Sequence, residues 1–434
     1  MNQENLAPNY AAILEGARRV GKSTIAEEFA KSNYRSYIKI DFANITTEVE
    51  DVFKDIASLD RFFLRLQTVS GVTLYKRESV IIFDEIQLYP KVRQAIKYLV
   101  LDGRYDYIET GSLISIKKNV KDIVIPSEEH KIPVYPMDYE EFMWATGNDT
   151  YNTLRDLYNL NEEVGNGTNR KLMKDFRTYM AVGGMPQAVK AYVDGKNFSQ
   201  IDSVKREIIN LYIDDFKKID SSGLIGKMYK SIPSQLATHK KRYVISQATQ
   251  KRKVAKDLER LSDLLDSKTV IPCYNTLNPS ITLSLTKDED TFKLYLSDVG
   301  LFTTMLFDSE PKTGENIYSK LLGDKLPADL GYLYENMVAQ IMRATGRELY
   351  YHTWNKEGST HSYEVDFLIQ SGKKIVPFEV KSSSRKTHES IDAFCQKYAK
   401  FISHAFLLSQ KDVAQEDNLL FKPVWMLPFI LEKV

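Results

Sequence analysis

A phosphate-binding signature lies near the start of the chain. Residues 16–23 read Gly-Ala-Arg-Arg-Val-Gly-Lys-Ser, which fits the spacing GxxxxGK[ST] between an apolar run and an amphipathic helical segment. The two glycines let the backbone curl so that consecutive N–H groups face an anion, and the helix N-terminus adds partial positive charge. Lys22 would reach the β- and γ-phosphate oxygens of ATP as a catalytic group, and Ser23 would ligate Mg²⁺. The residues predicted to bind the cofactor here are Gly16, Ala17, Arg18, Arg19, Val20, Gly21, Lys22, Ser23 and Thr24, with pairing to surface acids as the alternative for both arginines.

Two carboxylates follow the apolar run Val80-Ile81-Ile82-Phe83, as in a Walker B motif. Ligands of a parallel sheet collect at the carboxyl ends of its strands, where Asp84 and Glu85 would lie. Asp84 would hold Mg²⁺ through water, and Glu85 would polarise the attacking water as a general base. Thr110 and Ser112 end the next apolar run and are candidate sensors of the γ-phosphate, with a simple turn as the alternative.

A second set of carboxylates lies near the C-terminus, on a predicted hairpin formed by residues 363–369 and 374–381. Side chains alternate along a strand, so Glu379 and Lys381 share one face, and Asp366 on the neighbouring strand could join them. Such a group can hold Mg²⁺ and lower the pKa of bound water. The alternative is an ordinary solvated ion pair. The candidate metal ligands are Asp366, Glu379 and Glu335, the last on a predicted helix over 331–345, and Lys381 is a candidate catalytic residue that would steady the nucleophile or the phosphoryl charge.

Basic residues cluster in the middle of the chain, in a region that looks like the recognition helix of a helix-turn-helix. They are His239-Lys240-Lys241-Arg242, Lys251-Arg252-Lys253 and Lys256. DNA-binding proteins use such clusters to neutralise phosphates. The alternative is a solvated basic face, and no base-reading residue can be assigned.

The first 145 or so residues must position the phosphate-binding signature, and they alternate short β-rich runs with helical patterns. The runs are 12–15, 36–40, 80–83 and 107–110. This alternation predicts a parallel sheet flanked by helices. The third run is apolar throughout, as a strand buried on both faces requires.

The rest of the chain changes character several times. An Asn- and Gly-rich stretch predicts a loop over 147–170, and helical periodicity follows to about 220, broken by a turn at 183–186. Three short helices and two strands between about 226 and 306 favour a winged helix. A stretch with Pro and Gly from 306 to 330 indicates a linker into a last α/β unit.

Composition limits the class of protein. The chain has 434 residues, enough for several domains, and 59 basic residues nearly cancel 58 acidic ones. The whole-chain charge therefore gives no hint of a nucleic-acid or membrane partner. The two cysteines, Cys273 and Cys395, exclude a disulfide scaffold and a zinc finger. Neither an export signal nor a run of about 18 apolar residues occurs, so we expect a cytoplasmic protein without a membrane span.

Taken together, the motifs resemble a prokaryotic AAA+ type ATPase family over nearly the whole chain. The motifs are LEGARRVGKST, VIIFDEIQ, ETGS, IPVYPMDYEEF, YMAVGGMPQAV, KLYLSDVGL, YEVDFLI and PFEVKSS. The resemblance implies an α/β fold in which a P-loop parallel sheet with flanking helices precedes a helical and winged-helix region. A C-terminal PD-(D/E)XK domain, of the restriction-endonuclease-like α/β fold, would follow. The implied domains are a P-loop AAA+ ATPase core over 1–146, a helical lid over 147–225, a winged helix over 226–310 and a nuclease-like domain over 311–434.

By the same resemblance, Glu335, Asp366, Glu379 and Lys381 match the nuclease positions, and Asp84 and Glu85 serve Mg²⁺ and hydrolysis. One departure matters: many relatives have a Gly-Arg pair where this chain has Glu129-His130-Lys131, so no arginine finger or second sensor can be placed.

Three hypotheses on function follow from these motifs. The leading one is an ATPase that uses ATP and Mg²⁺ and couples its nucleotide state to a DNA-directed C-terminal half. The second is an ATP-dependent DNA nuclease that uses Mg²⁺ at the C-terminal carboxylates. The third is a non-cutting, nucleotide-gated regulator that binds DNA or a protein. A homo-oligomer or a protein partner is compatible with each of them.

Overall fold

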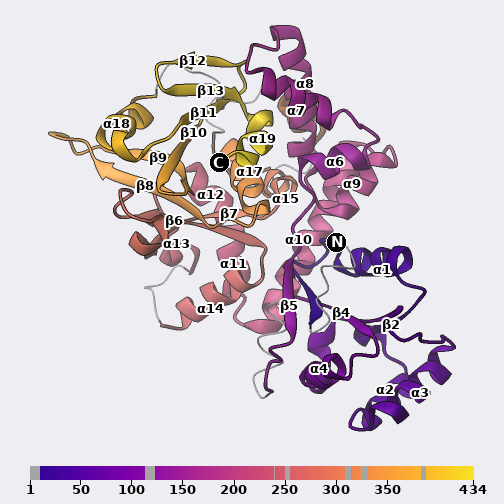
Figure 1. The fold of residues 1–434 in the computed structure, drawn as a ribbon. Helices are drawn as coiled ribbons and strands as arrows, with labels where there is room; N and C mark the ends of the chain where they lie inside the picture. Colours follow the sequence, from indigo (N-terminus) through magenta and orange to yellow (C-terminus); the bar gives the residue numbers. More distant parts are fainter. Residues whose placement is uncertain are drawn as a thin grey trace. The chain divides into compact units, whose positions relative to one another are not determined.

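The chain folds into two compact units, seen in the computed structural model (Figure 1). The first contains residues up to 135 together with 266–268, and the second contains 136–265 and 269–434. The structure describes residues 10–112, 123–238, 240–249, 255–307, 314–323, 331–382 and 388–434. The last three predicted domains therefore lie within the second unit, except for residues 266–268 of the predicted winged helix.

The first unit is built on a five-stranded sheet in which every neighbouring pair of strands is parallel. Its strand order is β2-β3-β4-β1-β5, so β3 and β1 lie on either side of β4. The four predicted runs are all strands of this sheet, which confirms the predicted parallel sheet. The strands are β1 (Ala11–Glu15), β2 (Ser36–Asp41), β3 (Ser79–Asp84), β4 (Asp106–Gly111) and β5 (Glu129–Pro133).

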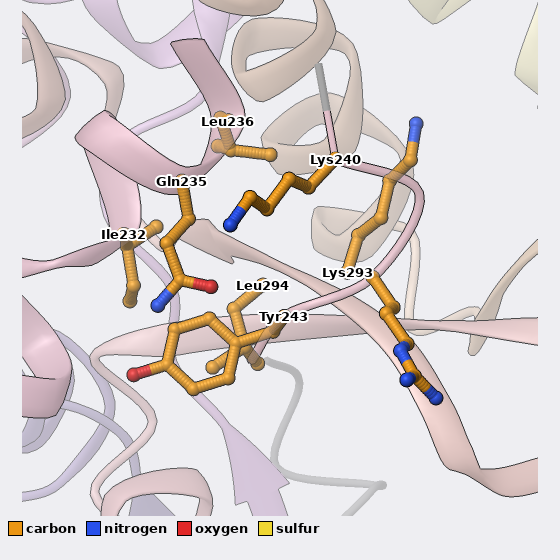
Figure 2. Close-up of a pocket in the computed structure, with 8 residues that line it drawn as sticks. Ile232, Gln235, Leu236, Lys240, Tyr243, Lys293 and Leu294 are labelled. Carbon is orange, nitrogen blue, oxygen red and sulfur yellow. The ribbon is translucent and has the colours of Figure 1, made fainter. Parts of the chain in front are cut away.

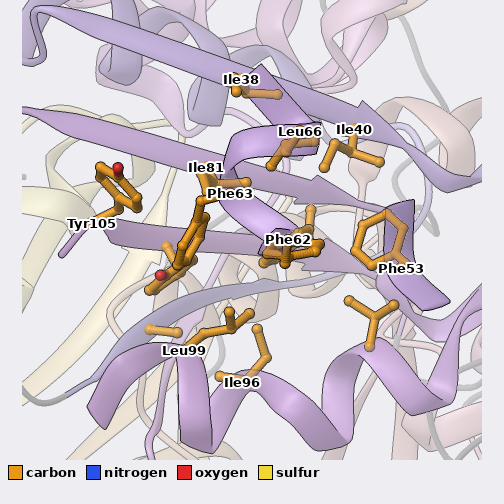
Figure 3. Packing of buried hydrophobic residues seen from close by; sticks show 14 of the residues in the cluster. Ile38, Ile40, Phe53, Phe62, Phe63, Leu66, Ile81, Ile96, Leu99 and Tyr105 are labelled. Atoms are coloured by element: carbon orange, nitrogen blue, oxygen red, sulfur yellow. The ribbon is translucent and has the colours of Figure 1, made fainter. Parts of the chain in front are cut away.

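Helices bury both faces of this sheet. On one face, Ala26 and Ala30 of α1 pack against the strands beside Ile82 and Ile108. On the other face, a larger aromatic and aliphatic cluster packs between the sheet and the helices α3 and α4 (Figure 3). Burial on both sides explains why residues 80–83 are apolar without alternation. The helices of this unit are α1 (Lys22–Asn33), α2 (Thr47–Val52), α3 (Leu59–Ser70) and α4 (Pro90–Asp102).

The second unit begins with a group of helices. A reciprocal capping box between Asp138 and Glu141 fixes the start of the first of them. The predicted loop over 147–170 is wrong in part, because α7 lies within it and α8 begins before its end. Tyr151 and Leu154 of α7 are buried, so packing outweighs the polar composition of this stretch. The helices are α6 (Tyr139–Ala145), α7 (Tyr151–Leu160), α8 (Asn166–Val182), α9 (Pro186–Val193) and α10 (Phe198–Ile219).

Four further helices among the described residues precede two strands, which the sequence predicted as the wing of a winged helix and which belong to a larger sheet. β6 pairs antiparallel with β7 but also parallel with β8, so both are strands of the eight-stranded C-terminal sheet (Figure 1). The buried Cys273 and Leu349 face each other across the β6–β8 pair, so burial favours this pairing. The elements are α11 (Leu224–Lys230), α12 (Ile232–Ala237), α13 (Ile245–Thr249), α14 (Ala255–Asp266), β6 (Val270–Thr276), β7 (Lys287–Leu296) and α15 (Val299–Leu306).

The predicted linker over 306–330 also contains a helix, α16 (Gly314–Leu322). Tyr318 of this helix is buried, and its hydroxyl donates to Asp202 and accepts from Lys205. The segment is therefore part of the core of the second unit. Pro311 and Pro327, on which the linker prediction partly rested, lie outside the described residues.

The C-terminal strands complete a mixed sheet with the order β12-β13-β11-β10-β9-β8-β6-β7. The predicted hairpin is confirmed: β9 and β10 are antiparallel, and Gly372 takes a left-handed φ of 58° in the turn. Among the described residues, no helix is long and apolar enough to cross a membrane. The elements are α17 (Gly331–Ala344), β8 (Leu349–Asn355), β9 (Ser362–Ser371), β10 (Lys374–Val380), α18 (Glu389–Lys397), β11 (Ala405–Ser409), β12 (Ala414–Glu416), β13 (Leu419–Pro423) and α19 (Leu427–Glu432).

Candidate functional site

The phosphate-binding signature forms a loop between β1 and α1 that closes around the Lys22 side chain. Lys22 Nζ donates to the backbone oxygens of Gly16 at 3.1 Å and Ala17 at 2.9 Å. The Lys22 side chain is buried. Burial lowers the pKa of its ammonium, while the carboxylates of Glu85 and Asp84 oppose that shift. The ammonium is therefore held by the loop backbone, within the field of Asp84 and Glu85.

The two glycines of the loop are needed for different reasons. Gly21 has a φ of 97°, a left-handed conformation that disfavours a side chain. Gly16 is needed for space, because a Cβ atom there would lie 2.1 Å from the backbone oxygen of Val134. The Val134 N–H donates to Glu15 O at 2.6 Å, and this hydrogen bond fixes residue 134, with its backbone oxygen, beside the loop. Arg19 is a non-glycine residue of the loop with a left-handed φ, 70°.

The Asp84 carboxylate is the hub of polar contacts at the carboxyl edge of the sheet. Ser23 Oγ donates to its Oδ1 at 2.6 Å, and the Thr110 hydroxyl donates to the same oxygen. Lys39 Nζ lies 3.5 Å from its other oxygen. Asp84 is only 5% exposed. The residues predicted on three separate runs thus meet at one point, beside the Lys22 loop.

Glu85 follows this hub in a left-handed conformation, with a φ of 55°. Its backbone N–H donates to Thr110 Oγ1 at 3.2 Å, so Thr110 bridges both Walker B residues. Its side chain accepts a hydrogen bond from Gln87 Nε2. A strained backbone at a carboxylate beside a phosphate-binding loop is typical of a functional position.

The oxygens at this edge match what Mg²⁺ prefers. Ser23 supplies a hydroxyl and Asp84 a carboxylate, and hard cations such as Mg²⁺ take oxygen ligands and keep several waters. The residues present therefore fit a magnesium ion held jointly by the protein and by phosphates. The remaining predicted cofactor residues differ in exposure: Ala17 and Val20 are buried, Arg18 and Ser112 are half-buried, and Arg19 and Thr24 are exposed.

A buried ionic cluster beneath the same sheet was not predicted. Arg93 of α4 makes a bidentate ion pair with Glu129 of β5, at 2.7 and 2.6 Å, and both side chains are almost fully buried. Glu109 lies beside this pair, and neither of its carboxylate oxygens has a hydrogen-bond partner among the described residues. Burial and the Glu129 charge raise the pKa of Glu109 well above its ordinary value, with Arg93 opposing. Glu129 is therefore the buried ion-pair partner of Arg93.

The predicted C-terminal carboxylates do come together. Lys381 Nζ lies 2.7 Å from Glu379 Oε1, and the Val380 N–H donates to Asp366 Oδ2 at 2.8 Å. The charges of Glu379 and Glu335 act on Asp366, whose pKa is raised well above its ordinary value mainly by burial. Of these residues Glu379 is buried, and Asp366, Glu335 and Lys381 are half-buried, so the cluster is partly shielded from solvent.

Two further charged residues belong to this C-terminal cluster and were missed. Lys293 Nζ lies 2.6 Å from Glu364 Oε1 and 3.6 Å from Glu335 Oε2. Lys293 is on β7, which the sequence assigned to another domain, so no local spacing could reveal it. Among the described residues, no group of three or more His, Cys, Asp or Glu side chains is arranged to hold a metal ion.

The basic segment is only partly within the described residues. His239 and 251–253 lie outside them, while Lys241, Arg242 and Lys256 are exposed. Arg242 lines a cavity of about 210 Å³ together with the acidic residues 289 and 290, so this face carries both signs of charge.

Residues of three of the sequence motifs, IPVYPMDYEEF, YMAVGGMPQAV and KLYLSDVGL, make close backbone contacts in the second unit. The Gly184 N–H donates to Asp298 Oδ2 at 2.6 Å, and the Met137 N–H donates to Gly184 O at 2.8 Å. A Cβ atom on Gly184 would lie 2.1 Å from Met137 O, and one on Gly300 would lie 2.6 Å from the Cα atom of Gly183. These motifs therefore specify close backbone contacts rather than chemistry.

Comparison with known families divides the chain into three matched segments. Residues 8–143 match a family described as an AAA domain. Residues 173–312 match a domain of unknown function, DUF8612, and residues 330–427 match another, DUF4143. The first match supports an ATPase-type, nucleotide-binding function for the first unit. A nuclease-like fold is not given by any of the three matches.

Individual relatives are distant. The uncharacterized protein MJ1637 of Methanocaldococcus jannaschii is 25% identical over 187 residues, which span 41% of this chain and 38% of that protein. The structure of Cdc6p from Pyrobaculum aerophilum aligns over 74% of this chain and 90% of its own, with 12% identity and a TM-score of 0.23. Can2 from Sulfobacillus thermosulfidooxidans, solved with cyclic tetra-adenylate, aligns over 92% and 98% with 11% identity and a TM-score of 0.20. At these TM-scores neither alignment carries an argument about this chain.

Proposed function

We propose that this protein is an ATPase that binds MgATP at the Lys22 loop, hydrolyses it, and couples its nucleotide state to a DNA-directed second unit. The observation that supports it is the meeting of Ser23 and Thr110 at one carboxylate, Asp84, whose charge also acts on the loop lysine. The AAA domain match over residues 8–143 supports the ATPase part independently.

Each residue of the site has a chemical task in this proposal. Lys22 leaves its two backbone acceptors and pairs with the β- and γ-phosphate oxygens when ATP enters. Ser23 and Asp84 would hold Mg²⁺, which supplies charge neutralisation on the phosphates. Glu85 accepts a proton from the attacking water, and its strained backbone fixes the direction of its carboxylate. The Thr110 hydroxyl donates to the Asp84 carboxylate and accepts from the Glu85 N–H, so a displacement of one acid would shift the other.

Coupling to the second unit has a covalent path in the chain. Val134 touches the first glycine of the phosphate-binding loop through its backbone oxygen, and Met137 follows three residues later. Met137 O accepts from the Tyr179 hydroxyl at 2.6 Å, and this hydroxyl accepts from Gln340 of α17 at 3.1 Å. A displacement of the loop on nucleotide binding would thus be passed along residues 134–137 to a buried hydrogen-bond chain. That chain ends on the helix that carries Glu335.

The experiment that tests the proposal measures phosphate release from ATP with and without duplex DNA, and DNA binding in the presence of ATP or ADP at several salt concentrations. We expect MgATP-dependent turnover and a DNA affinity that differs between the two nucleotides and falls with salt. Turnover with no effect of nucleotide on DNA affinity would support the ATPase activity and refute its coupling to DNA. A protein partner or a second copy of the chain would then be the target of the coupling.

The ATP-dependent nuclease is the second candidate, supported by the convergence of Asp366, Glu379 and Lys381 in one cluster. Incubating plasmid with Mg²⁺ or Mn²⁺ separates it from the non-cutting regulator. Cutting by the wild type that is lost in Asp366→Ala favours the nuclease, whereas nucleotide-dependent binding without cutting favours the regulator.

A further inference from the structure

The C-terminal acidic cluster contains a buried lysine that none of its motifs supplies. Lys293 is 5% exposed, and its ammonium contacts Glu364 at 2.6 Å and Glu335 at 3.6 Å. Its stem lines a cavity of about 10 Å³, room for about one water, and runs away from Gln235 and Tyr243 on the other side of that cavity (Figure 2). The charged end of Lys293 is thus committed to the carboxylates.

The lysine is strongly held as a cation by its neighbours. The carboxylates of Glu364 and Glu335 beside its ammonium supply the counter-charge that a buried cation needs. A buried ammonium without such partners would lose its proton. Lys293 and Lys381 therefore bring two positive charges to the four carboxylates of the cluster, which are Glu335, Glu364, Asp366 and Glu379.

Protein donors engage one oxygen of each of the four carboxylates, while the second oxygens of Glu364 and Glu379 are buried without a hydrogen-bond partner among the described residues. Lys293 contacts Glu364, and the Tyr295 hydroxyl donates to Glu335 at 3.1 Å. The backbone N–H of residue 380 donates to Asp366, and Lys381 contacts Glu379. A divalent cation needs several carboxylate oxygens turned toward a common point, and the described residues offer no such group. As arranged, these residues do not fit the metal ion of a nuclease.

We infer that Lys293 is the resident cation of this cluster and that the cluster is an ion-pair network joining β7 to β9 and α17, rather than a divalent-cation centre. The ammonium of Lys293, on β7, contacts Glu364 on β9 and Glu335 on α17. It therefore occupies the position between these carboxylates that a bound metal ion would take. Truncating a buried lysine of this kind leaves carboxylates without a counter-charge, which a cation from solvent can then supply. This inference is independent of the proposed ATPase activity, and it speaks against the nuclease candidate, which needs a divalent cation at the same carboxylates.

Mn²⁺ binding to the nucleotide-free full-length chain tests the inference, followed by electron paramagnetic resonance. We expect that Asp366→Asn does not change the amount of Mn²⁺ bound by the wild type. We expect Lys293→Met to gain one Mn²⁺ per chain, to lose it again when Asp366→Asn is added, and to melt at a lower temperature than the wild type unless Mn²⁺ is present. The matched control, Lys373→Met, removes an exposed lysine of the nearby turn and should behave as the wild type.

Two results would overturn the inference. One is stoichiometric Mn²⁺ binding by the wild type that Asp366→Asn abolishes, because a metal then shares the cluster with Lys293. The other is a folded Lys293→Met chain that gains no Mn²⁺. If Lys293→Met does not fold, the comparison of the wild type with Asp366→Asn decides alone. ATP hydrolysis by the same samples shows separately whether the ATPase proposal stands.

Discussion

Replacing Gly16 with alanine tests why the phosphate-binding loop needs its first glycine. The added Cβ atom would lie 2.1 Å from Val134 O and 3.1 Å from Val134 C. Real Cβ contacts essentially never fall below 3.0 Å, so either the loop or residue 134 must move by about 1 Å. The clash involves backbone atoms of residue 134, which is joined to β1 by the hydrogen bond from Val134 N–H to Glu15 O. No flexible side chain can therefore move aside to relieve it. Such overpacking costs about 1–3 kcal/mol.

The expected consequence is functional more than structural. A misplacement of about 1 Å in a catalytic site can cost about 100-fold in rate, so Gly16→Ala should lose about two orders of magnitude in kcat/KM for ATP. Binding of a fluorescent ATP analogue and phosphate release measure this, and circular dichroism verifies that the chain remains folded. The matched control is Gly167→Ala, whose Cβ atom would meet nothing within 4 Å. Wild-type binding and turnover in folded Gly16→Ala would refute the reasoning.

Two further predictions concern stability. Gly184→Ala places a Cβ atom 2.1 Å from Met137 O, so the second unit should lose about 1–3 kcal/mol or more, measured by urea unfolding; an unchanged midpoint would contradict the close contact. Glu109→Gln tests the buried carboxyl. A carboxyl whose folded-state pKa is raised contributes stability that is complete below its ordinary value of 4.5 and is lost as pH rises toward the folded-state pKa. The melting temperature of Glu109→Gln should therefore exceed that of the wild type by a margin that grows from about pH 5 to about pH 8, and a constant margin would show that Glu109 titrates normally.

The sequence predicted the nucleotide site well because the signals there are local. The spacing from Gly16 to Ser23 and the apolar run before Asp84 each define a strand end, and parallel strands bring such ends to one edge. The contact between Ser23 and Asp84 therefore follows from pattern and topology. The close approach of Val134 to the loop does not, because it depends on how β5 lies beside β1.

The second unit was predicted less completely because its structure depends on contacts between distant segments. Two strands at 270–296 looked like a wing, since nothing near them indicates a partner, yet β8 pairs with β6. The helix α16 lies in a stretch with proline and glycine, and burial of Tyr318 holds it in the core. Lys293 reaches Glu364 across 71 residues of sequence, and no spacing rule covers such a distance.

ATP hydrolysis by the wild type and by Lys22→Ala tests the central claim most directly, with Lys31→Ala as the control for removal of an exposed lysine on the same helix. We expect MgATP-dependent phosphate release by the wild type and by Lys31→Ala. Lys22→Ala should lose about 100-fold or more, because the charge that meets the phosphates is gone. Equal hydrolysis by Lys22→Ala and the wild type would contradict the assignment of the Lys22 loop as the site of ATP chemistry.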